Sequence, residues 1–261
     1  MTTPFTSPSR LAITGVDGLP EVRRGDDLAV LLIDGCERNG VALRDHDVLV
    51  VAQKIVSKSE GRLARLADVG PSARAIELAT ATGKDARIVE LMLREAVRVL
   101  RVGRDVIVVE DRRGLVLANA GIDQSNTGSA DPDAEVLLLP IDPDASAASL
   151  RSGISARCGS TVGVIISDSL GRAWRLGTVG HAIGSAGLPA LVDWRERADR
   201  YGRRLRHTEI ALADSLAAAA VLVMGEASEG RPAAVVRGIS PLMGNGGAKA
   251  LQRSRERDLF R

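Results

Sequence analysis

The fold is most clearly indicated by the segment Val164-Ile165-Ile166-Ser167-Asp168-Ser169-Leu170-Gly171-Arg172-Ala173-Trp174-Arg175. Its apolar, β-branched beginning predicts a buried strand over residues 162–167, and residues just past a strand end are held rigidly while meeting solvent. Asp168 and Ser169 follow that end and offer hard oxygen ligands of the kind that Mg²⁺ or Mn²⁺ prefers. Arg172 and Arg175 could face a phosphate or a carboxylate. A strand followed by an ordinary polar turn explains the same residues, so this segment alone leaves both interpretations open.

Other apolar runs alternate with Ala- and Arg-rich helical patterns, which indicates a mixed α and β protein. Further strands are expected over residues 48–52, 106–109 and 233–236. Helices are expected over residues 26–36, 72–81, 88–100 and 208–222. Pro140 and Pro143 should interrupt any element between them. The order of the strands does not follow from these patterns.

The composition is that of an ordinary globular protein. With 261 residues, of which 45% are hydrophobic and 26% charged, the chain can form one large domain or two small ones. The 35 basic residues nearly balance the 33 acidic ones, and only two Trp, one Tyr and two Phe are available for stacking on bases. These numbers argue against a nucleic-acid partner.

Neither a membrane nor an export pathway is indicated. No run approaches the roughly 18 to 20 apolar residues that span a bilayer, and the first ten residues lack the apolar core of a signal peptide. The two cysteines, Cys36 and Cys158, do not have the spacing of a metal or redox motif. We therefore expect a reduced, cytoplasmic protein with no membrane partner.

Known glycine-rich nucleotide motifs are absent from the sequence. Residues 244–249 read GNGGAK, which misplaces the lysine of a Walker A motif and lacks its Ser or Thr, so a flexible turn is the simpler explanation. Residues 53–62, QKIVSKSEGR, follow an expected strand, and Lys54 and Lys58 could grip a polyphosphate as point charges. A solvated polar turn fits those residues equally well.

Two more polar loops could contribute to a site. Residues 119–128 contain Asp123, a candidate metal ligand, and Asn126, which could contact a nucleotide. Residues 224–232, MGEASEGRP, add the carboxylate of Glu226 between glycines that permit close approach to a ligand. Loops of this kind also cap themselves, and Gly225 could simply end a helix. The three histidines have no metal-ligand spacing.

Taken together and in order, six segments resemble the coenzyme F420-0:γ-glutamyl ligase family. The first, within 18–28, combines GLPEV and GDDL. The other five are KIVSKSEGR at 54–62, GIDQSN at 121–126, LLPIDPDASA at 138–147, ISDSLGRAWR at 166–175 and AVVRG at 234–238. The resemblance runs from about residue 11 to residue 238, which is nearly the whole chain.

The resemblance implies a GTP-dependent ligase of deazaflavin coenzyme biosynthesis. Such enzymes add L-glutamate to the phospholactyl carboxylate of coenzyme F420-0, in some cases followed by γ-linked glutamates, and release GDP and phosphate. The implied fold is mixed α/β (α+β), specific to the family and without a P-loop, in an intertwined homodimer. The ligase domain would span residues 11–240, after a disordered or extended N-terminus at 1–10 and before a polar C-terminal tail at 241–261. The reductase domain that is fused to some relatives is expected to be absent.

The resemblance also implies cofactors and residue roles. Two Mg²⁺ or Mn²⁺ ions per site are expected, with K⁺ as a further activator. Asp123 and Asp168 would hold one divalent ion, and Ser169 and Glu226 the second. Relatives often have Thr in place of Ser169, which keeps the hydroxyl, and Ser in place of Gln53, which leaves the role of Gln53 open. The residues implied to line the GTP site are Leu19, Pro20, Glu21, Val22, Gln53, Lys58, Asn126, Met224, Gly225, Glu226, Ala227, Ser228, Glu229, Gly230 and Arg231.

The implied chemistry suits these residue types. A carboxylate and an amine do not condense in water, so the carboxylate must first become an acyl phosphate. Two divalent ions can neutralise the β and γ phosphates, while Lys58, with Arg172 or Arg175, would stabilise the transferred charge or hold an acidic substrate. No residue stands out as a general base. A phosphoryl-transfer enzyme with another acceptor and a GTP-binding regulator remain as alternatives, although four expected metal ligands argue against a regulator.

Overall fold

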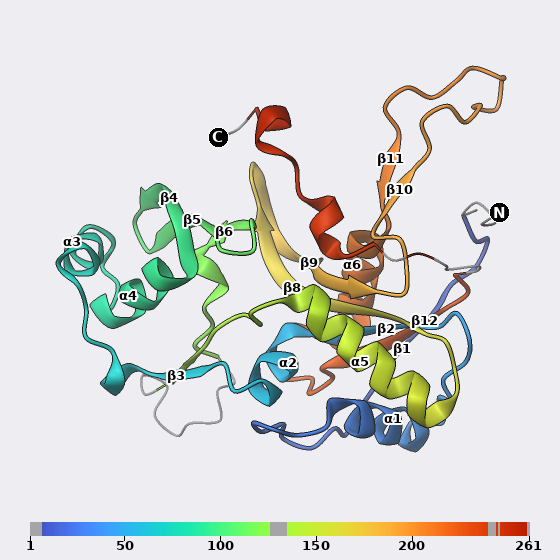
Figure 1. Ribbon diagram of the computed structural model, residues 1–261, viewed down its shortest axis with the longest axis horizontal. Helices are drawn as coiled ribbons and strands as arrows, with labels where there is room; N and C mark the ends of the chain where they lie inside the picture. Colours follow the sequence, from blue (N-terminus) through green and yellow to red (C-terminus); the bar gives the residue numbers. More distant parts are fainter. Residues whose placement is uncertain (1–6, 126–134, 240–243, 245, 260–261) are drawn as a thin grey trace.

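The computed structural model describes residues 7–125, 135–239, 244 and 246–259 (Figure 1). Its largest element is a five-stranded sheet with the strand order β1-β12-β2-β8-β9. The strands are β1 (Ala12–Gly15), β12 (Ala233–Arg237), β2 (Val48–Ala52), β8 (Gly163–Arg172) and β9 (Arg175–Ala186). β2 and β8 run parallel, whereas every other neighbouring pair is antiparallel. The expected strands at 48–52 and 233–236 and the mixed fold class are confirmed.

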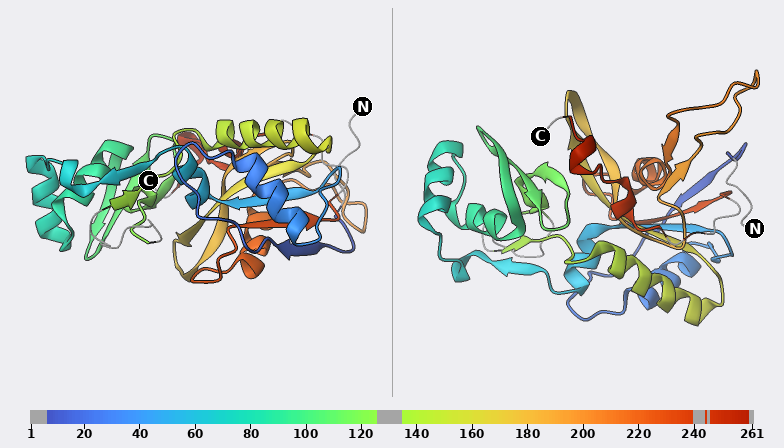
Figure 2. Two further views of the ribbon diagram at one scale, coloured as in Figure 1. Left: turned by 90° about the horizontal axis from the view of Figure 1, so that it is seen from below. Right: turned by 45° about the horizontal axis from the view of Figure 1, so that its top comes forward.

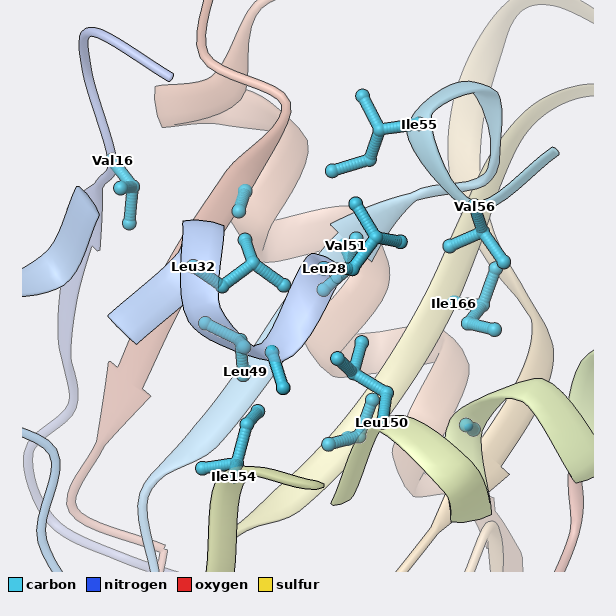
Figure 3. Close-up of a cluster of buried hydrophobic side chains, with 14 of the residues drawn as sticks. Val16, Leu28, Leu32, Leu49, Val51, Ile55, Val56, Leu150, Ile154 and Ile166 are labelled. Atoms are coloured by element: carbon cyan, nitrogen blue, oxygen red, sulfur yellow. The ribbon is translucent and has the colours of Figure 1, made fainter. Parts of the chain in front are cut away.

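Helices cover both faces of this sheet (Figure 2). α1 (Leu28–Arg38) and α5 (Pro143–Cys158) lie on one face, and α6 (Leu212–Met224) lies on the other. Alternate side chains of each strand therefore enter different cores: Leu49 and Ile166 pack with α1 and α5 (Figure 3), while Ile165 packs with α6. Burial on both faces explains why the central strands are continuous apolar runs instead of alternating patterns.

The helices begin and end at residues suited to those positions. Asp27 caps α1 by accepting hydrogen bonds from the backbone N–H groups of Ala29 and Val30. Asp142 caps α5, and Pro143 occupies the first turn, where a missing N–H costs nothing. Pro143 thus starts a helix that the sequence analysis did not predict. α5 is rich in Ala and Ser and has a weakly amphipathic pattern.

The chain between α2 (Gln53–Ser59) and α5 forms a smaller lobe with its own apolar core, seen at the left of Figure 1. The core includes Leu78, Met92, Ile107 and Val136. The lobe contains β3 (Leu63–Arg65), α3 (Ala73–Thr82), α4 (Ala86–Glu95), β4 (Ala96–Gly103), β5 (Val106–Asp111), β6 (Val116–Ala118) and β7 (Glu135–Leu137). β4, β5 and β6 form one sheet, and β3 pairs with β7. The strand expected at 106–109 and the helix expected at 72–81 are confirmed.

Three expected boundaries are wrong. The helix expected over 88–100 ends at Glu95, because the following residues form β4, which pairs with β5. The helix expected over 208–222 begins at Leu212, because Glu209–Ala211 is a short strand, β11, paired with β10 (Leu191–Asp193). The strand expected over 162–167 begins at Gly163 and continues to Arg172, since β9 pairs with it throughout. In each case tertiary pairing overrides the local pattern.

The last described residues pack against the body of the molecule. Ala248, in the short 3-10 helix Ala248–Leu251, is buried, and its backbone N–H donates to Asp144 Oδ1 at 2.7 Å. Farther along, Gln252 Nε2 donates to the carbonyl oxygen of Arg113 at 3.1 Å. A second 3-10 helix covers Arg255–Arg257. Within the described residues, no helix is both long enough and apolar enough to cross a membrane.

Candidate functional site

A cavity of about 540 Å³ lies where β2 ends beside β8. Four separate stretches line it, at 19–22, 52–58, 167–169 and 221–232, together with Asp123. Of the residues expected around GTP, those that line the cavity are Leu19, Pro20, Glu21, Val22, Gln53, Lys58, Met224, Gly225, Glu226, Ala227, Ser228, Glu229, Gly230 and Arg231. Asn126 lies outside the described residues. All four expected metal ligands, Asp123, Asp168, Ser169 and Glu226, line the same cavity.

The pairing of β8 explains why Asp168 and Ser169 reach this cavity. β2 ends at Ala52, opposite Ser167, so the next residues of β8 have no parallel neighbour. On the other side, Ile166 pairs with Gly184 and Ser167 with Ala182, which leaves a bulge in the ladder. Bulges commonly redirect side chains beside functional sites. The two polar residues are therefore held by a strand but open to the cavity.

Asp168 has an unusual protonation equilibrium. The pKa of Asp168 is raised to about 6, mainly by burial and also by the negative charges of Asp123 and Glu226. The backbone N–H of Ser169, which donates to Oδ1 at 2.9 Å, and the charge of Lys54 oppose this rise in pKa. Asp123 and Glu226 are thus close enough to Asp168 to affect its charge.

The cavity also contains direct pairs between its polar groups. Lys54 Nζ lies 2.6 Å from Asp123 Oδ2 and donates to Ser125 Oγ at 2.7 Å. Ser169 Oγ donates to both carboxylate oxygens of Glu226, each at 2.7 Å. The two residues expected to share the second metal are therefore in direct contact.

α2 carries two lysines into the cavity. It begins directly after β2, and Lys54 and Lys58 lie four residues apart, on one side of the helix. Lys58 is buried and pairs with Glu21, which is largely exposed. Gln53 is also buried, and its Oε1 accepts a hydrogen bond from Ser57 Oγ at 2.9 Å. Gln53 therefore supports the start of α2 as well as lining the cavity.

The smaller lobe supplies Asp123. Its backbone N–H donates to the carbonyl oxygen of Leu137 at 3.0 Å, and the N–H of Leu137 donates back to Asp123 at 2.8 Å. Across the junction, Arg62 Nη2 lies 2.9 Å from Glu95 Oε1, and its Nε donates to the carbonyl oxygen of Leu139 at 2.8 Å. These contacts fix the smaller lobe against the segment that leads into α5.

The loop after α6 ends the helix and also lines the cavity. Gly225 ends the helix with a positive φ of 80°, and its backbone N–H donates to the carbonyl oxygen of Val221. Glu229 Oε2 accepts a hydrogen bond from the backbone N–H of Ala227 at 2.8 Å. Arg231 Nε donates to Asp17 Oδ1 at 2.7 Å, which links the end of the loop to the segment between β1 and α1. The loop is both a capped helix end and a wall of the cavity.

The donor chemistry of the cavity fits divalent metal ions. Three carboxylates and one hydroxyl are the hard oxygen donors that Mg²⁺ and Mn²⁺ take. The pKa of Asp168 is raised mainly by burial and also by the neighbouring carboxylates, and a bound cation would offset both effects. Among the described residues, no three His, Cys, Asp or Glu side chains already form a metal-binding group. Instead, Asp123 is paired with Lys54, and Glu226 with Ser169.

Arg172 and Arg175 are not brought to this cavity. They face each other across the end of the hairpin formed by β8 and β9, and neither lines the cavity. Arg172 Nη2 donates to the carbonyl oxygen of Leu176 at 3.0 Å. Between the two arginines, Trp174 has a positive φ of 60° and is 81% exposed. The expected catalytic role of both arginines stays a prediction.

Lys54 lines the cavity, although the family resemblance does not imply a role for it. Its sequence position, four residues before Lys58, suggests a polyphosphate contact, but the resemblance alone did not include it among the site residues. In the structure it lies between Asp123 and Ser125 and also affects Asp168. The spacing of the two lysines was the signal that could have identified it.

Comparison with known proteins shows to which family the chain belongs. A family model described as F420-0:Gamma-glutamyl ligase matches residues 18–238. The chain belongs to this family. Every stretch that lines the cavity falls inside the matched residues.

Several archaeal proteins resemble the chain along nearly their entire length. The coenzyme F420:L-glutamate ligase of Methanothermobacter thermautotrophicus is 46% identical over 255 residues, which cover 96% of this chain and 99% of the relative. The protein of the same name from Methanopyrus kandleri is 49% identical over 92% of this chain and 94% of its own length. That of Archaeoglobus fulgidus is 44% identical over 97% of both. The chain is therefore a ligase.

Proposed function

We propose that this ligase joins the amine of L-glutamate to the phospholactyl carboxylate of coenzyme F420-0, using GTP and releasing GDP and phosphate. One or more further glutamates would be added through γ-linkages. One observation carries the proposal. A single cavity collects every expected nucleotide-lining residue that the structure describes and all four expected metal ligands, in a chain whose relatives are named coenzyme F420:L-glutamate ligase.

The charge of the cavity supports a requirement for divalent ions. Its five carboxylates outnumber its three cationic side chains; they are Glu21, Asp123, Asp168, Glu226 and Glu229, against Lys54, Lys58 and Arg231. A nucleoside triphosphate is itself polyanionic, so cations must accompany it into such surroundings. We infer two Mg²⁺ or Mn²⁺ ions, one held by Asp123 and Asp168 and the other by Ser169 and Glu226.

The proposed reaction has two steps. A carboxylate oxygen of the acceptor attacks the γ-phosphorus of GTP, GDP leaves, and an acyl phosphate forms. The nitrogen of glutamate then attacks the acyl carbon, phosphate leaves with the electrons of the C–O bond, and the nitrogen loses its proton. The divalent ions supply neutralisation of the charge on the β and γ phosphates.

The residues of the chain bind and orient the reactants in this proposal. The buried ammonium of Lys58 offers a positive charge to the phosphoryl oxygens once a nucleotide competes for it with exposed Glu21. The stretch 19–22 and the loop 224–231 both line the cavity and would contact the nucleotide. We assign no general base, and K⁺ is proposed as an activator on family resemblance alone.

A homodimer is part of the proposal. Trp174 is 81% exposed and Leu176 is 98% exposed at the end of the hairpin formed by β8 and β9, and a second copy would cover this apolar surface. A homodimer could also carry Arg172 and Arg175 toward the cavity of the partner. Sedimentation equilibrium of the intact protein tests this part directly.

Mass spectrometry of the deazaflavin after incubation with GTP, L-glutamate and Mn²⁺ tests the function. We expect a gain of one or more glutamyl units that requires both the metal and GTP. GTP hydrolysis without any gain in mass would indicate phosphoryl transfer to a different acceptor. If neither GTP nor the deazaflavin changes, the proposed ligation is wrong and a regulatory GTP-binding protein becomes the better description.

A further inference from the structure

Lys54 connects the two lobes at the edge of the cavity. It belongs to the first turn of α2, beside the main sheet, whereas Asp123 and Ser125 come from the smaller lobe. Lys54 Nζ contacts Asp123 Oδ2 at 2.6 Å and Ser125 Oγ at 2.7 Å. The other carboxylate oxygen, Asp123 Oδ1, accepts a hydrogen bond from the backbone N–H of Ser125 at 2.7 Å. Both oxygens of Asp123 are therefore engaged.

This pairing conflicts with metal binding by Asp123. Mg²⁺ binds a carboxylate oxygen at about 2.1 Å, and such an ion would sit within a few ångströms of an ammonium that contacts the same carboxylate. Two like charges at that separation repel each other strongly in a partly buried site. Lys58 poses no such conflict, because its partner Glu21 is not an expected metal ligand.

We infer that Lys54 is a tethered cation that holds Asp123 until a divalent ion takes its place. The side chain is 32% exposed and has a flexible four-carbon stem, so the ammonium can leave Asp123 without disturbing α2. Once released, it stays beside the cavity, where it adds a positive charge next to an incoming phosphate. The inference rests on the proposed metal site and identifies Lys54 as its positioning residue.

Mn²⁺ affinity without nucleotide, measured by isothermal titration calorimetry at pH 7.5, tests the inference. Lys54→Met should bind Mn²⁺ about fivefold more tightly than the wild type, because the metal no longer displaces an ion pair worth about 1 kcal/mol. Lys249→Met is the matched control: Lys249 is an exposed lysine outside the cavity, and its loss should leave the affinity unchanged. Melting temperatures of both variants check that they are folded.

Ser125→Ala distinguishes an effect of the direct contacts of Lys54 from an effect of its positive charge alone. It retains the charge of Lys54 but removes one of its two partners, so Mn²⁺ binding should tighten by a smaller factor, about twofold. Equal affinity of Lys54→Met and wild type would overturn the inference while leaving the metal site intact. Tighter binding by Lys54→Met with no change in Ser125→Ala would also overturn it, since the field of the lysine would then suffice. If the wild type binds no Mn²⁺ with or without GTP, both the inference and the proposed metal site are wrong.

Discussion

The two halves of β8 share one backbone ladder with β9 but differ in their other neighbour. In the first half, Val164, Ile165 and Ile166 are fully buried, with β2 on one side and β9 on the other. In the second half β2 has ended, and Asp168 and Ser169 are partly exposed. The site is therefore located by the point where a neighbouring strand stops, at Ala52, and not by the end of β8 itself.

The largest loss of activity should come from a substitution in the second half of β8. Asp168→Asn removes one negative charge from the proposed metal ligands, and we expect kcat/KM for glutamate ligation to fall by about a thousandfold or more, because metal ions supply several kcal/mol of charge stabilisation. The melting temperature should change little, since Asp168 forms no ion pair with the residues that the structure describes. Ligation by this variant at a rate near that of the wild type would remove Asp168 from the metal site.

A substitution in the first half of β8 should reduce stability and leave activity nearly unchanged. Ile166→Ala leaves a cavity in a fully buried position and should lower the free energy of unfolding by about 2 to 5 kcal/mol, measured in urea. At temperatures where the variant remains folded, its kcat/KM should stay close to that of the wild type. A large loss of activity in folded Ile166→Ala would show that the two halves of the strand are not separable.

Metal binding by the second half of β8 should depend on pH. Because the pKa of Asp168 is about 6, protons compete with a metal below that pH and not above it. The affinity for Mn²⁺ should fall as the pH drops from 6 to 5, by up to about tenfold, and should change little between pH 7 and pH 8. Calorimetric titrations at each pH, on protein whose circular dichroism shows it to be folded, measure this directly. An affinity that is constant down to pH 5 would mean that Asp168 does not bind the metal.

The smallest effect is expected for the conservative change Ser169→Thr. Ser169→Thr keeps the hydroxyl that meets Glu226, so ligation should stay within about threefold of the wild type, whereas Ser169→Ala loses it and should be much slower. Steady-state assays at several Mn²⁺ concentrations compare the three proteins. Equal activity of the Ala and Thr variants would show that the hydroxyl is dispensable.

The strands at the centre of the molecule could be predicted because two-sided burial leaves an uninterrupted apolar run. The continuation of β8 to Arg172 could not, because polar residues there are held only by pairing with β9, a partner distant from any local pattern. The same reason explains why Glu95 ends a helix whose apolar spacing continues into β4. α5 escaped prediction because its Ala- and Ser-rich surface carries little amphipathic signal.

Site residues that belong to the motifs of the family could be predicted from the sequence. Residues whose role depends on contacts between distant segments could not. The resemblance identified Asp168 and Glu226, which line one cavity, but it also suggested Arg172, which the hairpin takes away from that cavity. It passed over Lys54, because its importance lies in a contact with Asp123 between two lobes. Contacts between distant segments are the part of a site that is hardest to predict from a single sequence.

The strand order has a consequence for how the chain folds during its synthesis. The central strand β2 pairs on one side with β8, more than a hundred positions later, and on the other with β12, which also joins it to β1. Residues 233–237 must therefore leave the ribosome before the first and second strands can be joined in one sheet. The smaller lobe includes the pairing of β3 with β7, but all of its strands have been synthesised by Leu137, so it can form earlier. Because distant pairing is slow, closure of the sheet should be the late event, and a nascent chain will expose the apolar edge of β2 until then.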